Sequence, residues 1–372
     1  MDRRTFLSGA AIAGASIASA CGDTSQQGSD VASPAINRGV KRLRMVTTWP
    51  ANFPGLGTAA NNVAAYANAA SGGTLDIRVY AAGEIVSAFE AFDAVSEGTA
   101  DMYHGAEYYW QGKSPAFNFF TAVPLGMTAT EIMGWVEFGG GQALWDELSG
   151  QFNIKPFQAG NSGHQMGGWF KREINSLEDF RGLRMRIPGL GGNVLRELGG
   201  AAVTLSGGEI YPALQSGAID ATEWVGPWND LAFGFYREAP FYYGPGFHEP
   251  GSCLGVGMNL GVWNDLDEDH KAIIQAACRA ANNVSLAEFT YQNAQALDVL
   301  LNEHGVQLRS FTDEMWSRIG EISEQVVSDT GNADAMTRRV YDSYLTARNQ
   351  MQNWGRISEM PYMAHRDRIL RG

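Results

Sequence analysis

Three short segments hold the residues best suited to bind a charged ligand: residues 160–170, 180–189 and 220–228. Each mixes glycines and aromatic side chains with isolated polar groups, which is typical of a cleft wall with a few convergent donors. The second segment contains Arg184 and Arg186, which the alternation of a β-strand places opposite the apolar residues around them. An arginine that points from a strand into a cleft can bind a carboxylate through two parallel hydrogen bonds. The alternative is a pair of solvated surface arginines.

Glu223 is the candidate acid of the third segment. It lies in an otherwise aromatic and apolar stretch, between Ala221 and Trp228. A carboxylate taken out of water needs a counter-charge, so we expect either an arginine or a bound cation beside it. The simpler alternative is a structural ion pair.

The sequence contains no motif of the common catalytic classes. G-x-S-x-G, G-x-x-x-x-G-K-[ST], H-E-x-x-H and C-x-x-C are all absent. The glycines of residues 255–261 miss the spacing of a dinucleotide-binding loop. The six histidines have no partner at metal-ligand spacing: His104, His164, His248, His270, His304 and His365. These features favour a binding protein, but distant residues can converge in a fold. An exported hydrolase or lyase with Glu223 or His164 as base is therefore an alternative.

A β-α-β unit is the first pattern of secondary structure. Residues Leu43 to Trp49 are bounded by Pro50 and predict a strand. An alanine-rich helix over 58–70 follows, and residues 75–80 predict a second strand. Such a unit implies a parallel sheet with helices on its faces, and therefore the α/β class.

Two segments, 119 residues apart, repeat one layout. Residues 91–102 and 210–221 each hold a helical apolar stripe, then a glycine, then a short strand next to an aspartate. Glycine after a helix supplies the left-handed conformation that ends it. Because 372 residues exceed one comfortable core, the repeat predicts two lobes of similar plan. The alternative is a chance match of two common units.

The C-terminal third is predicted to be mainly helical. A long helix spans 267–303, a strand follows at 306–311, Thr312 caps the next helix, and residues 333–353 are helical again. The aromatic residues near the end either pack on the protein's own surface or form a dimer contact: Tyr341, Tyr344 and Trp354.

Residues 1–21 are predicted to be a twin-arginine export signal. Two adjacent arginines precede a weakly apolar run that is too short to span a bilayer stably. Cys21 follows, either as a lipidation site or as a free cysteine near an ordinary cleavage site. Residues 22–41 predict a disordered tether.

Composition and cysteines limit the remaining possibilities. A net charge of −13 argues against a nucleic-acid partner, because nothing supplies a basic face for phosphates. Cys253 and Cys278 either pair in an oxidising compartment or stay as two separate buried thiols, which is the simpler interpretation.

The quoted segments resemble the periplasmic receptors of tripartite ATP-independent periplasmic (TRAP) transporters. They are most similar to the branch that binds 2-oxoacids or lactate together with a metal ion. The similarity runs from Leu43 to the C-terminus and is most specific around Arg186 and in residues 221–224. Further similar segments are 47–50, 165–170, 182–187, 207–214 and 219–227.

The resemblance implies a two-lobed periplasmic solute-binding fold, with mixed sheets flanked by helices and long C-terminal helices. Lobe I would contain residues 42–163 plus about 254–312, lobe II residues 164–253, and a C-terminal helical segment residues 313–372.

The resemblance also implies a role for each matching residue. Arg186 would grip the ligand carboxylate, and Glu223 would hold a cation. The other cation ligands would be the main-chain carbonyl of Trp224, the amide oxygen of Gln165 and the carboxylate of Glu249. An all-oxygen shell suits Na⁺ or Ca²⁺. Donors to the ligand would be Asn161, Gln165, Tyr103 and Tyr108, and its alkyl end would be covered by Trp49, Trp169 and Phe247.

The implied function is capture of a small monocarboxylate in the periplasm, without chemistry, for delivery to TRAP membrane subunits after the lobes close. Some relatives dimerise through a C-terminal helix, so residues 332–353 are the candidate dimer contact. The alternatives are a metal-free receptor for another organic or sugar acid and a purely structural lipoprotein.

Overall fold

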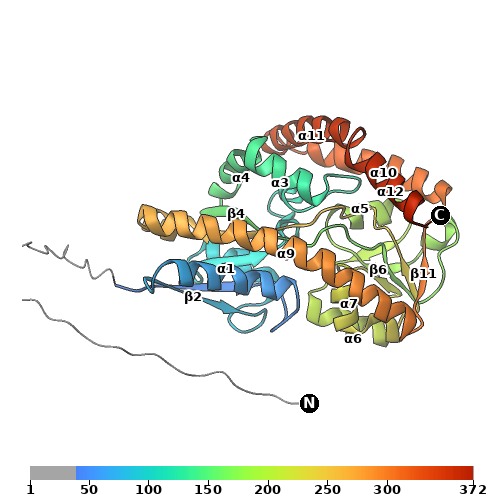
Figure 1. The fold of residues 1–372 in the computed structure, drawn as a ribbon, viewed down its shortest axis with the longest axis horizontal. Helices are drawn as coiled ribbons and strands as arrows, with labels where there is room; N and C mark the ends of the chain where they lie inside the picture. Colours follow the sequence, from blue (N-terminus) through green and yellow to red (C-terminus); the bar gives the residue numbers. More distant parts are fainter. Residues whose placement is uncertain (1–38, 372) are drawn as a thin grey trace, which may run out of the picture. The chain divides into compact units, whose positions relative to one another are not determined.

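The first β-sheet joins the N-terminal strands to one strand from much later in the chain (Figure 1). The structure, a computed structural model, describes residues 39–371. Strand β1 pairs in parallel with β2 and β3, whereas β10 pairs antiparallel with β3 and β4, in the order β2-β1-β3-β10-β4. The strands are β1 (Lys41–Thr47), β2 (Leu75–Tyr80), β3 (Met102–Gly105), β4 (Ile154–Asn161) and β10 (Cys253–Asn259). Helix α1 (Leu56–Ala70) links β1 to β2, which confirms the predicted β-α-β unit.

The second sheet has the order β11-β9-β5-β8-β6-β7 and is also mixed. Strand β6 pairs in parallel with β7 and β8, and β5 pairs antiparallel with β8 and β9. The strands are β5 (Gly168–Phe170), β6 (Arg184–Arg186), β7 (Ala201–Val203), β8 (Ala221–Thr222), β9 (Phe241–Tyr243) and β11 (Gln307–Arg309).

The internal repeat predicted from the sequence is a repeat of structure. Helix α2 (Ala91–Ser96) leads into β3 beside β1, and helix α6 (Gly207–Ser216) leads into β8 beside β6. A glycine with positive φ follows each helix, at Gly98 (82°) and Gly217 (76°). In both copies the aspartate before the strand accepts hydrogen bonds from the main-chain and side-chain nitrogens of one arginine: Asp101 with Arg44 and Asp220 with Arg184.

Long helices connect and cover the sheets. Helix α9 (Glu268–Asn302) packs on α1 and β4 along one part and on α7 (Pro227–Phe233) along another (Figure 1). The predicted C-terminal helices are confirmed as α10 (Asp313–Gly331) and α11 (Ala335–Gly355), and Thr312 caps α10. The remaining helices are α3 (Ala129–Phe138), α4 (Gly141–Gly150), α5 (Gly189–Glu197), α8 (Leu260–Asn264) and α12 (Glu359–Arg371). Short 3₁₀ helices are η1 (Ala88–Glu90), η2 (Glu107–Trp110), η3 (Pro115–Phe120), η4 (Leu177–Phe180) and η5 (Phe235–Arg237).

One strand differs from the predicted lobe limits. Residues 254–312 were expected in lobe I, yet β11 pairs in parallel with β9 of the second sheet. The reason is α9, which carries the chain from one sheet to the other before β11 begins. The other lobe limits stay a prediction.

Several sequence-based predictions concern termini and cysteines. The export signal of residues 1–21, Cys21 and most of the tether at 22–41 lie outside the described residues. Within residues 39–371, no helix is both long enough and apolar enough to cross a membrane. Cys253 and Cys278 are free and buried, which confirms the interpretation as two separate thiols. Tyr344 packs in the core, whereas the side chain of Trp354 is 66% exposed.

Candidate functional site

Arg186 and Glu223, the two charged candidates from the sequence, are in direct contact. Arg186 ends β6, Glu223 follows β8, and both side chains are 1% exposed. The guanidinium Nη1 donates to Glu223 Oε1 at 2.5 Å and to the Glu223 carbonyl oxygen at 3.2 Å. It also lies over the indole ring of Trp224, 5.0 Å from its centroid. Residues 37 positions apart in the chain therefore form one buried ion pair.

Arg184 shares the strand face with Arg186 but takes no part in this site. Its side chain is 49% exposed and forms a two-point contact with Asp220. Strand β6 is only three residues long, so its two arginines reach different surroundings. Arg184 is thus a surface arginine, as the simpler interpretation expected, whereas Arg186 is buried and its role as a carboxylate clamp stays a prediction.

The hydrogen-bonding capacity of the buried ion pair is largely used, as a stable buried pair requires. Arg186 Nε donates to the Leu205 carbonyl oxygen at 3.2 Å, and its Nη2 donates to the Tyr109 hydroxyl at 3.4 Å. Burial opposes the charged guanidinium, but the neighbouring Glu223 carboxylate raises the pKa of Arg186. Arg186 therefore stays a fixed positive charge.

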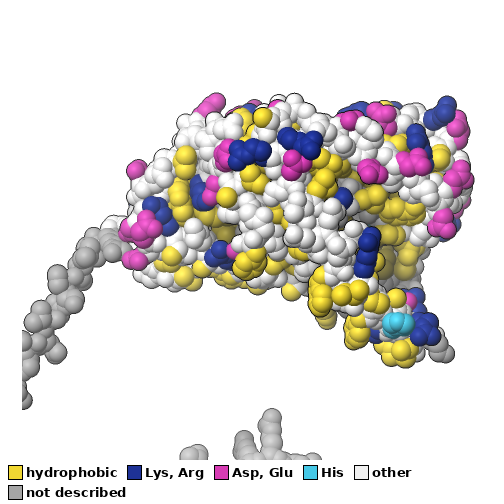
Figure 2. Space-filling view, turned by 90° about the horizontal axis from the view of Figure 1, so that it is seen from above, with side chains coloured by type: hydrophobic (Ala, Val, Ile, Leu, Met, Phe, Trp, Pro, Cys, Tyr) yellow, Lys and Arg dark blue, Asp and Glu magenta, His cyan; other side chains and the backbone are white. Residues whose placement is uncertain are grey.

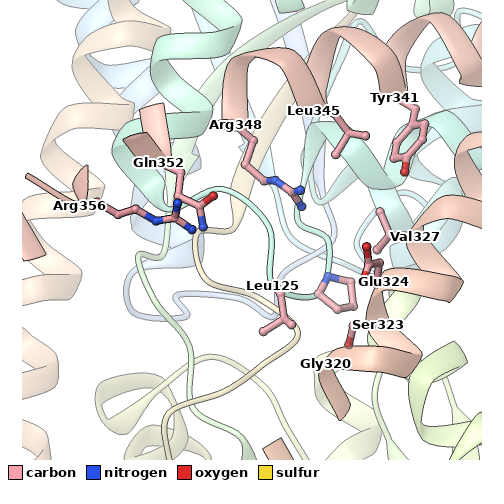
Figure 3. Close-up of a pocket in the computed structure, with 11 residues that line it drawn as sticks. Leu125, Gly320, Ser323, Glu324, Val327, Tyr341, Leu345, Arg348, Gln352 and Arg356 are labelled. Carbon is pink, nitrogen blue, oxygen red and sulfur yellow. The ribbon is translucent and has the colours of Figure 1, made fainter. Parts of the chain in front are cut away.

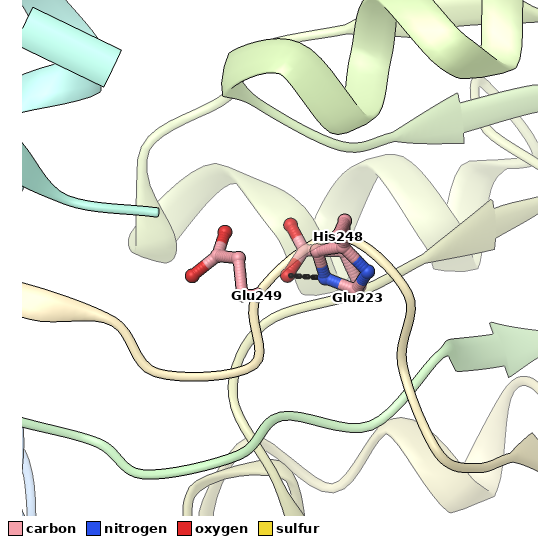
Figure 4. Close-up of side chains that lie close together, drawn as sticks. All are labelled: Glu223, His248 and Glu249. Carbon is pink, nitrogen blue, oxygen red and sulfur yellow. Dashed lines mark hydrogen bonds and ion pairs between the residues drawn. The ribbon is translucent and has the colours of Figure 1, made fainter. Parts of the chain in front are cut away.

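A second carboxylate and a histidine complete the cluster. Ligand atoms of Glu223, His248 and Glu249 all lie within 4.8 Å of one another (Figure 4). The imidazole Nε2 is 3.2 Å from Glu223 Oε2, and Ser252 donates a hydrogen bond to Glu249. Burial opposes a charged imidazole, but the contact with Glu223 raises the pKa of His248. Burial first, and then the charge of Glu223, raises the pKa of Glu249 to about 7.

These residues fit a hard cation. Two buried carboxylates at this separation repel each other unless a proton or a cation lies between them. Gln165 donates through Nε2 to Ser162 and Ser252, which leaves its buried Oε1 without a partner. Carboxylate and amide oxygens are the donors that Na⁺ and Ca²⁺ prefer.

The site lies where the chain crosses between the two sheets. Gln165 belongs to the β4–β5 connection, and Glu249 to the β9–β10 connection. The two connections run side by side, because Gln165 N donates to the Glu249 carbonyl oxygen and Gly246 N to that of Gln165. Ser162 N donates to the Ser252 carbonyl oxygen in the same way. A change in the angle between the sheets would therefore change the relative positions of the residues in these two connections.

Asp230 fixes the main chain that follows Glu223. Its buried carboxylate accepts from the Val225 nitrogen, the Trp169 indole at 3.0 Å and the Tyr242 hydroxyl at 2.7 Å. The Trp169 ring stacks on Tyr242 with centroids 3.9 Å apart. Trp169 was expected to cover the ligand. Its indole N–H is bound to Asp230, and the covering role of its ring stays a prediction.

Asn161 and Tyr108, two further predicted donors to the ligand, are both buried. Asn161 is buried at the end of β4, and its Nδ2 has no partner, so it is free to donate. Tyr108 is buried beside the cluster. Burial first, and then the charges of Glu249 and Glu223, raise the pKa of its hydroxyl.

The predicted role of Tyr103 does not fit its surroundings. Its hydroxyl donates to Glu107 at 2.8 Å, and its ring packs against Phe92 and Trp110 in the apolar core. The reason is the alternation along β3, which turns Tyr103 toward this core.

Sequence reasoning missed His248 and Tyr109. His248 directly precedes Glu249, and Tyr109 directly follows Tyr108, so each was adjacent to a residue that was selected. No periodic pattern marks either one. Only their contacts with Glu223 and Arg186 reveal them.

Comparison with known proteins gives the family. The profile of the DctP family, described as bacterial extracellular solute-binding protein, family 7, matches residues 45–333. The chain belongs to this family. It is 40% identical over 366 residues to a monocarboxylate 2-oxoacid-binding periplasmic protein of Nostoc sp., which covers 97% of this chain and 98% of that protein.

Solved structures of this family confirm the fold, two mixed sheets flanked by helices. A TRAP solute-binding protein from Pseudoalteromonas atlantica, with bound sodium and pyruvate, is 37% identical with a TM-score of 0.85, covering 87% of this chain and 99% of that one. One from Colwellia psychrerythraea, with calcium and pyruvate, is 38% identical with a TM-score of 0.85, covering 88% and 99%. One from Bordetella bronchiseptica, with calcium and picolinate, is 32% identical with a TM-score of 0.87, covering 89% and 98%.

These relatives confirm the resemblance read from the sequence. The family is one of solute-binding receptors, not of enzymes. The DctP-family chain described here is thus a TRAP solute-binding protein.

Proposed function

We propose that this DctP-family protein captures a small monocarboxylate, a 2-oxoacid or 2-hydroxyacid such as pyruvate or lactate, together with Na⁺ or Ca²⁺. The observation that carries the proposal is the buried contact of Arg186 with a two-carboxylate cluster that includes an unpartnered amide oxygen. Relatives that bind pyruvate with sodium or calcium support it.

The charges explain why a cation and an arginine act together. Arg186 is already paired with Glu223, so an anionic ligand alone would compete with this carboxylate for the guanidinium. A cation held by Glu223, Glu249 and Gln165, with the Trp224 carbonyl, would offset these carboxylates and attract both the carboxylate and the 2-oxo oxygen of the ligand. Arg186 then supplies charge-assisted hydrogen bonds to the ligand carboxylate. Micromolar affinity requires about 8 kcal/mol.

The surrounding aromatic side chains favour a small alkyl group. Trp49 and Phe247 are 1% and 5% exposed, and the Trp49 ring lies edge-on to Trp224. These two residues are the candidates to cover the ligand, together with the ring of Trp169, whose indole N–H binds Asp230. Asn161 and Tyr108 would donate hydrogen bonds to it.

Calorimetric titration with pyruvate tests the proposal directly. The protein is freed of cations by exhaustive chelation and dialysis into sodium-free buffer, and pyruvate is added with and without Na⁺ or Ca²⁺. We expect strong binding only when one of these ions is present. Undiminished binding without either ion would favour the metal-free receptor for another organic acid. Formation of product from pyruvate, followed by NMR, would favour an enzyme.

Membrane delivery follows from the same proposal. The family supports TRAP membrane subunits as the partner and the periplasm as the compartment. Export through the twin-arginine pathway and lipidation at Cys21 rest on residues outside the described ones. Mass spectrometry of the mature protein from its host would distinguish acylated Cys21 from a simple cleaved terminus.

Self-association through the C-terminus is the remaining part of the proposal. Because Tyr344 is buried in its own chain, the contact moves from residues 332–353 toward Trp354 and α12. On the face in Figure 2, apolar side chains lie exposed among charged ones. The large apolar side chains of α12 that are more than half exposed are Met360, Tyr362, Met363, Ile369 and Leu370. Sedimentation equilibrium should show a dimer that Tyr362→Glu with Leu370→Glu converts to a monomer.

A further inference from the structure

A hollow away from the Arg186 site lies between α10, α11 and the loop at Pro124 and Leu125 (Figure 3). Its volume is about 600 Å³. One wall is apolar, formed by Leu125, Val327, Leu345 and the ring of Tyr341. The proposed capture of a carboxylate at Arg186 makes no use of this groove.

Two arginines with unpaired side chains line the groove, Arg348 in α11 and Arg356 directly after it. The guanidinium groups of Arg348 and Arg356 form no hydrogen bond or ion pair with any described residue, whereas most other arginines of residues 39–371 pair with a carboxylate. Figure 3 shows the Arg348 guanidinium pointing from α11 toward the Leu125 loop, with Arg356 about two helical turns further along, beyond Gln352. Glu324 is the one acidic residue that lines the groove. On a protein with a net charge of −13, two unpaired cations in one hollow attract an anion.

A buried hydroxyl is the second observation that points to a ligand. Ser323 lines the groove, is 1% exposed, and its Oγ has no hydrogen-bond partner. Buried polar groups are normally satisfied, so an orphaned hydroxyl beside a hollow suits a ligand oxygen.

The rim residue Leu125 has an unusual conformation. It has a positive φ of 50° and its side chain is 45% exposed at the groove. Leucine rarely adopts this conformation, and such backbone strain is concentrated at ligand-binding sites. A main-chain hydrogen bond holds Leu125 in place, because its nitrogen donates to the Phe247 carbonyl oxygen at 2.9 Å.

We propose that this groove is a second binding site, for an amphipathic organic carboxylate. The ligand carboxylate binds the guanidinium groups of Arg348 and Arg356 and accepts a hydrogen bond from the Ser323 hydroxyl. The apolar body of the ligand lies on Leu125, Val327 and Leu345.

Calorimetric titration with benzoate tests the second site. Full-length protein is titrated in excess pyruvate and Ca²⁺, and Arg348→Ala and Arg356→Ala are compared with the wild type. Each loses a charge-assisted hydrogen bond, so we expect roughly tenfold weaker benzoate binding. Arg318→Ala on α10 is the matched control, because that arginine pairs with Glu321 away from the groove. Benzoate binding that is absent, or unchanged in both variants, overturns the proposal.

Filling the groove provides an independent variant. A Cβ at Gly320 of α10 would lie 3.6 Å from Leu125 Cδ1, an ordinary contact, so Gly320→Leu blocks the hollow without a backbone clash. It should abolish benzoate binding while circular dichroism and the melting temperature confirm folding. Inorganic phosphate, which has no apolar body, should bind more weakly than benzoate. Equal binding of phosphate overturns the assigned ligand class.

Discussion

At the residue scale, the proposed function gives one guanidinium two carboxylate partners in turn. Arg186 is paired with Glu223 in the structure described here. We expect a ligand carboxylate to compete for the same donors and a cation on Glu223 to free them. The buried pair would then be the resting state of the binding site.

Arg186→Ala and Arg184→Ala form a matched pair on one strand. Arg186→Ala removes the guanidinium beside buried Glu223 and leaves only His248 next to this carboxylate, so we expect loss of pyruvate binding and a fall of about 3–5 kcal/mol in the free energy of unfolding. Arg184→Ala removes only a surface pair, worth about 0–1 kcal/mol, and should bind normally. Calorimetry and urea unfolding measure both. Normal pyruvate binding by Arg186→Ala would refute the assigned site.

Glu107 supplies a prediction about pH that is independent of the ligand. It is buried with Tyr103 as its hydrogen-bond partner, and burial raises its pKa from 4.5 to about 8. A raised pKa favours the neutral form in the folded state. Its contribution to stability is therefore complete below pH 4.5 and is lost as the pH rises to about 8.

Glu107→Gln should remove that part of the pH dependence. The amide keeps an acceptor for the Tyr103 hydroxyl but cannot ionise. We expect the fall in unfolding free energy between pH 5 and pH 8 to shrink, by at most about 1.4 kcal/mol per pH unit. Urea titrations at several pH values measure it, with the exposed Glu97→Gln as control. Identical pH profiles of wild type and Glu107→Gln would show that Glu107 ionises normally.

At the element scale, the paired β4–β5 and β9–β10 connections determine the site geometry. A Cβ at Gly246 would lie 2.8 Å from the carbonyl oxygens of Gln165 and Met166, so the two connections must separate. Gly246→Ala should weaken pyruvate binding in Ca²⁺ at least tenfold and cost about 1–3 kcal/mol of stability. Gly208→Ala in α6 meets nothing within 4 Å and serves as the control. Calorimetry showing equal affinity in both variants would mean that this spacing is not required.

At the scale of the whole molecule, α9 and the two connections join the sheets. Closure of the sheets on a ligand must therefore be visible at these connections. In hydrogen exchange followed by mass spectrometry, we expect pyruvate with Ca²⁺ to slow exchange in residues 162–167 and 244–252. Helix α12 has no buried residue and should not change. Protection confined to one sheet would argue against closure.

The sequence by itself determined the class of fold and the two central charges. The β-α-β unit, the glycine-ended repeat and the capped C-terminal helices follow from local patterns, which depend on neighbours in the chain. Arg186 and Glu223 stood out because charged residues in apolar stretches need a partner. Alternation alone left Arg184 and Arg186 equivalent, and the family resemblance selected Arg186. The tertiary structure shows that Arg186 pairs with Glu223, whereas Arg184 pairs with Asp220.

The structure also decided the residues that no periodicity marks. His248 and Tyr109 enter the site through contacts between distant segments, and Tyr103 points away from it, because its hydroxyl binds Glu107 and its ring packs in the core. Strand β11 joins the second sheet because α9 carries it there. The physical reason is the same in each case. Strand alternation and helical spacing determine on which face of its own element a side chain lies, but the tertiary packing determines which other segment that face contacts.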